Sequence, residues 1–145
     1  MIRTSRNGYN RRPMPEAIRI RLPPVLAAPF VLVVGLAARF GLSGELADFL
    51  GVALWTVMVY VVIVFVHPKI APLQAGLLAA AIGIAVELAQ LTPYPAALAE
   101  RISIFHLIFG SSYDPGDLPA YPAGAALAAL VHRGLLQLAP TLRAA

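Results

Sequence analysis

Long apolar stretches separated by short polar segments dominate the chain. They occupy residues 24–40, 48–67, 70–91 and 118–138. A helix needs about 20 mostly apolar residues to cross a bilayer core, and each stretch approaches that length. The second, DFLGVALWTVMVYVVIVFVH, has no charge after Asp48 and is too long for the buried strand that its β-branched residues would otherwise suggest. The pattern therefore predicts an all-α bundle of four transmembrane helices over residues 24–138.

The connection between the third and fourth stretches is long enough to hold a further element. In the segment LAERISIFHLIF, residues 98–109, the large apolar side chains recur at helical spacing while Glu100, Arg101 and His106 fall elsewhere. This spacing predicts a short amphipathic helix that lies at the outer membrane interface. The SSYDPGD that follows is typical of a turn, because Asp-Pro-Gly combines a fixed φ with a permissive one.

Composition supports a membrane protein and excludes several kinds of site. Of 145 residues, 59% are hydrophobic and only 12% are charged, whereas soluble domains carry about 25% charged residues. The chain contains no cysteine, so disulfides, thiolate metal sites and a cysteine nucleophile are excluded. Its length allows a single domain.

Basic residues are distributed unevenly along the chain. Six of the eleven lie in a basic arm, residues 1–23. With four spans and the amino terminus inside, the inner side also holds Lys69, Arg133 and Arg143, while the outer side holds Arg39 and Arg101. This bias predicts a multi-pass protein of the bacterial inner (cytoplasmic) membrane with both termini, including the tail 139–145, in the cytoplasm. The arm is expected to contact anionic lipid, and nucleic acid is not an expected partner.

The first apolar stretch also has features of a signal peptide, because charged residues precede it. It is longer than a typical signal core, however, and the Arg39-Phe40-Gly41 that follows is a poor cleavage site. We therefore expect a retained membrane anchor.

Glu87 is the only acidic residue well inside a predicted span. Charged residues at this depth usually face protein or a water-filled cavity. Counting back in steps of four from Glu87 gives Gly83, Ala79 and Ala75, a stripe of small residues that allows another helix to approach closely. Glu87 is therefore expected to face the protein interior.

The fourth span offers a matching surface at its outer end. Asp117 precedes a second stripe of small residues, formed by Ala120, Gly124 and Ala128. Antiparallel packing of the two stripes would bring Asp117 over Glu87. The complete predicted polar cluster consists of Glu87, Gln90, Asp117, Tyr121, Asp48 and His106.

Each of these residues also has a structural interpretation. Asp117 and Asp48 precede helices and could cap them. Glu87 could only join helices through Gln90 or Tyr121, and His106 could lie on the polar face of its helix. We find no histidine pair with zinc spacing, no glycine-rich phosphate loop and no nucleophile elbow, so neither a metal nor another cofactor is expected.

The chain resembles a known family in three segments, which are GELADFLGVALWTVMVY, VELAQL and HLIFGSSYDPGDLPAYPAGAALA. Over about residues 44–133 the chain resembles small bacterial membrane proteins of the domain of unknown function 2809 family, which is itself similar to VanZ-like proteins. The most specific elements are Glu87 and Gln90 together with Asp117, Tyr121 and Gly124, which match the D-xxx-Y-xx-G spacing of the family. VanZ-like proteins have Asn where Tyr121 stands, which favours the first family. The resemblance implies a compact helical membrane protein without an established activity; VanZ-like members are associated with glycopeptide-antibiotic resistance and envelope homeostasis.

Four classes of function are compatible with these features. The favoured one is a non-enzymatic membrane protein that binds an envelope lipid, a lipophilic ligand or a partner subunit at an outward-facing polar pocket. An enzyme acting on a lipid-linked envelope substrate, with Glu87 as general acid or base and Asp117 as its companion, is disfavoured because no nucleophile or metal site is evident. An ion or proton pathway would require an oligomer, and an accessory subunit of a larger membrane complex is the fourth alternative.

Overall fold

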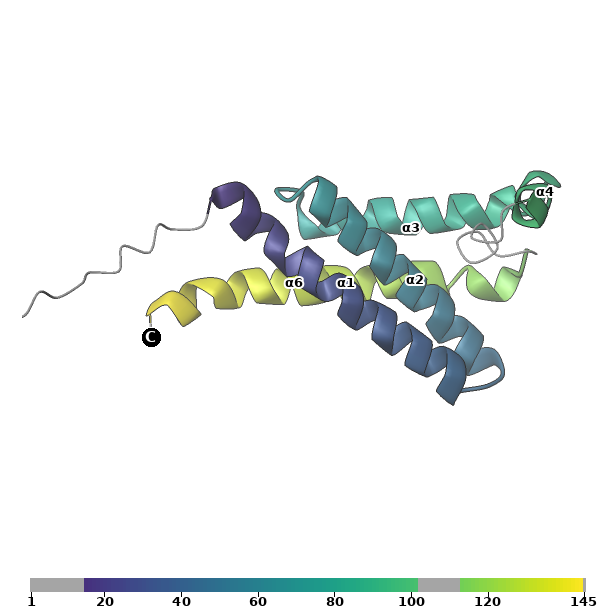
Figure 1. Ribbon diagram of the computed structural model, residues 1–145, viewed down its shortest axis with the longest axis horizontal. Coiled ribbons are helices and arrows are strands. Elements are labelled where there is room, and N and C mark those ends of the chain that lie inside the picture. The colour runs from purple at the N-terminus through teal and green to yellow at the C-terminus, as the bar shows by residue number, and fades with distance from the viewer. Residues whose placement is uncertain (1–14, 102–112, 145) are drawn as a thin grey trace, which may run out of the picture.

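The computed structural model describes residues 15–101 and 113–144, and their regular secondary structure is entirely helical (Figure 1). The elements are α1 (Glu16–Gly41), α2 (Glu45–Val66), α3 (Pro72–Ala89), α4 (Tyr94–Arg101), the 3-10 helix η1 (Pro115–Asp117) and α6 (Ala120–Ala144). The predicted all-α class with four long helices is confirmed. The interfacial helix predicted at 98–109 coincides with α4 only over residues 98–101, and its remainder lies outside the described residues.

Successive long helices run in opposite directions (Figure 1). As a result, α3 ends and α6 begins at one end of the bundle, which we call the Glu87 end. The opposite end, where α2 connects to α3, we call the Lys69 end. α6 packs against both α2 and α3, whereas α1 packs chiefly on α2.

Three helices are long and apolar enough to cross a membrane, at Glu16–Ala38, Glu45–Val66 and Pro72–Ala89. They correspond to the first three predicted spans. The fourth predicted span, 118–138, is helical from residue 120 onward, but α6 is not among the candidate spans. The polar residues His132, Arg133 and Gln137 in its second half lower its hydropathy.

α1 begins at Glu16, so residues 16–23 of the predicted basic arm are helical. The helix continues through Pro23, Pro24 and Pro29, each of which removes one backbone N–H from the helical hydrogen bonding; such losses are tolerated in membrane helices. Arg21 is accommodated at the Lys69 end, where its Nε donates to the carbonyl oxygen of Phe65 at 3.3 Å and its guanidinium lies 5.8 Å from the centre of the Phe65 ring. A cation in this position complements the C-terminus of α2.

Small side chains form most of the interface between α3 and its neighbours. Ala75 and Ala79 are completely buried and Gly83 is also buried, so the predicted stripe of α3 does face the protein. The predicted stripe of α6 is buried as well, at Ala120, Gly124 and Ala128.

The partners of the α6 stripe differ in part from the predicted ones. The nearest atoms to Gly124 belong to the backbone of Ala53 in α2. The α6 residues that face glycines of α3 are Tyr121, over Gly83, and Ala125 and Ala129, beside Gly76. The reason is that α6 contacts two helices at once, so its small residues are divided between two interfaces.

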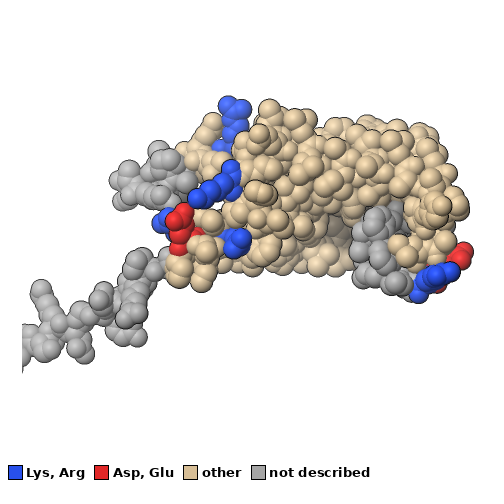
Figure 2. Space-filling model, turned by 90° about the horizontal axis from the view of Figure 1, so that it is seen from above, with Lys and Arg blue, Asp and Glu red and all other residues tan. Residues whose placement is uncertain are grey.

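Charged side chains gather at the two ends of the bundle, with an uncharged band between them on the face seen in Figure 2. Polar side chains within the band find partners inside the protein. Thr56 donates to the carbonyl oxygen of Val52 at 3.0 Å, and the Tyr60 hydroxyl shares a hydrogen bond of 2.7 Å with Nδ1 of His132. This distribution is typical of a protein whose middle section lies in lipid.

Candidate functional site

Glu87 connects three segments of the chain at the end of α3. Its side chain is only 1% exposed. Oε2 accepts a hydrogen bond of 2.6 Å from the hydroxyl of Tyr121, and Oε1 accepts one of 2.7 Å from the backbone N–H of Asp114. Each carboxylate oxygen therefore has a donor, and such charge-assisted hydrogen bonds are stronger than neutral ones. We call Glu87, Tyr121 and Asp114 the Glu87 clamp.

Tyr121 is held in the clamp by two other helices. Its ring packs on Gly83 of α3, where a Cβ atom would overlap the ring. The ring of Trp55 in α2 lies edge-on to it, with 6.2 Å between centroids and an interplanar angle of 81°. The position of the Tyr121 ring beside Glu87 is therefore fixed by its contacts with Gly83 and Trp55.

Asp114 belongs to the clamp but not to the polar cluster predicted from the sequence. Its side chain caps η1 by accepting a hydrogen bond of 2.8 Å from the N–H of Gly116, and this fixes the predicted Asp-Pro-Gly turn. The conformation of this turn points the backbone N–H of Asp114 at Oε1 of Glu87. Since the contact is made by the backbone, the residue type at position 114 gives no direct signal of it.

Asp117 is half-buried in η1, close to the clamp. Burial, and after it the nearby carboxylates of Glu87, Asp114 and Asp48, together raise the pKa of its carboxyl group to about 6. Glu87 is thus close enough to act on the carboxyl group of Asp117. Asp48, in the first turn of α2, is exposed but close enough to act on Asp117.

The other two predicted members of the polar cluster are placed differently. Gln90 is the residue that caps α3, half-buried, with its backbone N–H bonded to the carbonyl oxygens of Val86 and Glu87. His106 lies outside the described residues. The predicted cluster is thus assembled around Glu87, Tyr121 and Asp117, with Asp48 at its edge.

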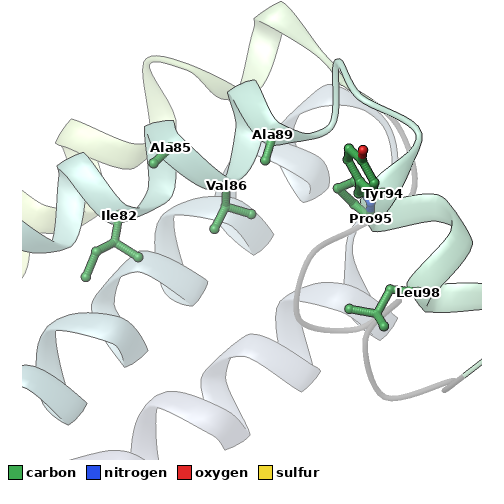
Figure 3. A pocket seen from close by; sticks show the side chains of 7 residues that line it. All are labelled: Ile82, Ala85, Val86, Ala89, Tyr94, Pro95 and Leu98. Carbon is green, nitrogen blue, oxygen red and sulfur yellow. The ribbon is translucent and has the colours of Figure 1, made fainter.

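An apolar pocket of about 370 Å³ lies between α3 and α4 (Figure 3). It is lined by Ile82, Ala85, Val86, Ala89, Tyr94, Pro95 and Leu98. The α3 residues in this lining lie on a different face from Gly83 and Glu87, which are buried against α6. A polar pocket at Glu87 is expected from the sequence, whereas the clamp occupies both Glu87 oxygens and this pocket is apolar.

Residues 42–125, more than half of the chain, match the model of a family described as protein of unknown function, DUF2809. The chain belongs to the DUF2809 family. The matched region contains the whole Glu87 clamp and the α3–α4 pocket, while α1 and the part of α6 after residue 125 lie outside it. Neither the curated proteins nor the solved structures contain a match to this DUF2809 protein. The family prediction is confirmed, and nothing in these comparisons supports the wider similarity to VanZ-like proteins.

Asp117 provides a pH-dependent prediction. Because its pKa is raised from 3.8 to about 6, the folded protein binds more protons than the unfolded chain between these values. The stability linked to this raised pKa is fully present below about pH 4 and is lost as the pH rises through about 6. We expect Asp117→Asn, which stays neutral, to match the wild type at pH 4 and to exceed its stability at pH 8. Unfolding in mild detergent at both pH values measures this, and a variant that follows the wild type at both would contradict it.

Proposed function

We propose that this DUF2809 protein is a non-enzymatic integral membrane protein that binds the apolar chain of an envelope lipid in the α3–α4 pocket. The pocket itself is the observation that carries the proposal. Its volume, about 370 Å³, lies within the range of roughly 300–1,000 Å³ typical of small-molecule sites. Its lining of aliphatic side chains, proline and one tyrosine suits a hydrocarbon chain.

The proposal includes four membrane crossings with both termini in the cytoplasm of a bacterium. α6 has 25 residues, and a helix of that length spans about 37 Å, more than the roughly 30 Å of a bilayer core. His132, within α6, is hydrogen-bonded to Tyr60 inside the bundle, which reduces the cost of placing it in lipid. Arg19, Arg21 and Lys69 lie towards the Lys69 end, as the positive-inside rule requires of a cytoplasmic side. Labelling of single cysteines introduced near each end of this cysteine-free chain checks the topology.

In this proposal the Glu87 clamp supports the pocket and does not bind the lipid. The clamp fixes the last turn of α3, which supplies Val86 and Ala89 to the pocket. A site whose walls are fixed before binding loses less entropy when the ligand arrives. An enzyme with Glu87 as general acid or base is disfavoured, since the side chain is 1% exposed and both oxygens already accept hydrogen bonds.

The test is to fill the pocket with a larger side chain. Val86→Phe places an aromatic ring in the pocket, and we expect it to abolish the lipid that the wild-type protein retains when it is purified in mild detergent. Val62→Phe is the matched control, because Val62 is 53% exposed on α2 and does not line the pocket. Native mass spectrometry counts bound lipids in all three proteins. Equal lipid binding by the three, or no bound lipid in the wild type, would rule the proposal out.

A further inference from the structure

The face of α4 that lines the pocket also carries a basic residue, Arg101, at the end of the helix. Tyr94 and Leu98 line the pocket from α4, and Arg101, the last residue of the helix, follows Leu98 by three positions and Tyr94 by seven. Residues at these spacings share one face of a helix, with about 5–6 Å between the Cβ atoms of neighbours three apart. Arg101 is exposed, so its guanidinium is accessible at the rim of the pocket.

One acidic residue, Glu100, neighbours Arg101 on its own helix. Three others, Glu87, Asp114 and Asp48, lie near Asp117, whose pKa is raised by burial and then by these carboxylates. Glu100, the neighbour of Arg101, is turned by about 200° from Leu98 around the helix axis and therefore lies on the other side of α4. Arg101 forms no ion pair with any residue that the structure describes.

We infer that the pocket takes a phospholipid, with its acyl chain along α3 and its phosphate on Arg101. This inference rests on the function proposed above and adds the headgroup chemistry. In Figure 1, α4 is seen nearly end-on beside the last turn of α3, so it lies across the end of a candidate membrane span. Lipid phosphates are found at that depth. A guanidinium presents several N–H donors in a fork that fits phosphate oxygens, so the apolar pocket and Arg101 together match the two parts of a phospholipid.

The experiment reads lipid binding at the pocket itself. The chain has one tryptophan, so Trp55→Phe combined with Tyr94→Trp leaves a single tryptophan, which lies at the pocket and can be excited selectively. Its quenching is measured in phosphatidylcholine vesicles that contain a small fraction of either brominated phosphatidylcholine or brominated diacylglycerol with the same chains. We expect the phosphate-bearing lipid to bind about fivefold more tightly, the value of one favourable arginine contact with a charged headgroup.

The variants separate the headgroup from the pocket. We expect Arg101→Gln to make the two lipids equivalent, Arg101→Lys to keep most of the preference, and Lys69→Gln at the opposite end to keep all of it. An unchanged preference in Arg101→Gln would overturn the phosphate contact and leave the proposed lipid pocket standing. If adding Val86→Phe changes the quenching by neither lipid, the proposed function fails as well. Millimolar inorganic phosphate is expected to leave the preference in place, because the acyl chain holds the headgroup beside Arg101. Loss of the preference at that concentration would show that Arg101 favours free phosphate over a lipid headgroup and would overturn the inference.

Discussion

Gly124→Ala is expected to lower the free energy of unfolding by about 3 kcal/mol, at the upper end of the cost of overpacking a well-packed interior. A Cβ atom at position 124 would overlap the carbonyl group of Ala53 in α2. A side chain in that place could rotate away, but a helical backbone cannot, so α2 and α6 would have to separate. In a membrane, close packing is a main force that holds helices together, and separation would weaken contacts along both helices.

Gly134→Ala is the matched control for this prediction. Gly134 lies on the same helix, and a Cβ atom there would meet nothing within 4 Å. We expect this variant to be as stable as the wild type or slightly more stable, because alanine favours a helix over glycine by about 1 kcal/mol. Unfolding in detergent, followed by circular dichroism, compares the two variants. Equal stability of Gly124→Ala and Gly134→Ala would show that the α2–α6 interface has room for a methyl group at position 124 and would contradict the prediction.

The helices could be predicted from the sequence because apolar length is a strong signal. The stretches at 48–67 and 70–91 correspond closely to α2 and α3. The start of α1 could not be predicted from hydropathy, since Arg21 continues the helix by binding the end of α2. Hydropathy also does not define where the last span ends, because it counts His132 in α6 as a polar residue that should end the span. In the structure the ring of His132 has a hydrogen-bond partner, Tyr60, within the bundle.

The candidate site could be predicted only in part. Helical spacing and antiparallel packing were enough to bring Glu87, Tyr121 and Asp117 together. They could not identify the N–H of Asp114, which depends on the path of a turn, or Trp55, since aromatic residues are common at membrane interfaces. The pocket depends on the direction in which α4 leaves α3, and no periodicity within either helix encodes that direction.

The other large effect is expected at the clamp itself. Glu87→Ala leaves the Tyr121 hydroxyl and the Asp114 N–H without their acceptor. Hydrogen bonds to charged groups contribute about 1.5–3 kcal/mol each, but those in membrane proteins average about 0.6 kcal/mol. For two bonds to one buried carboxylate, we expect a loss of about 3 kcal/mol in the free energy of unfolding.

Milder variants divide this loss between the two contacts. Tyr121→Phe keeps the ring on Gly83 and removes one hydrogen bond, so about 1 kcal/mol should be lost. The double variant with Glu87→Ala should then be little less stable than Glu87→Ala alone, because the two residues are coupled. Unfolding of the four proteins in detergent completes the cycle. A residue of the clamp is required for stability, whereas an acid that only binds a ligand is not. If Glu87→Ala is as stable as the wild type but no longer retains lipid, Glu87 binds the lipid and does not hold the helices together.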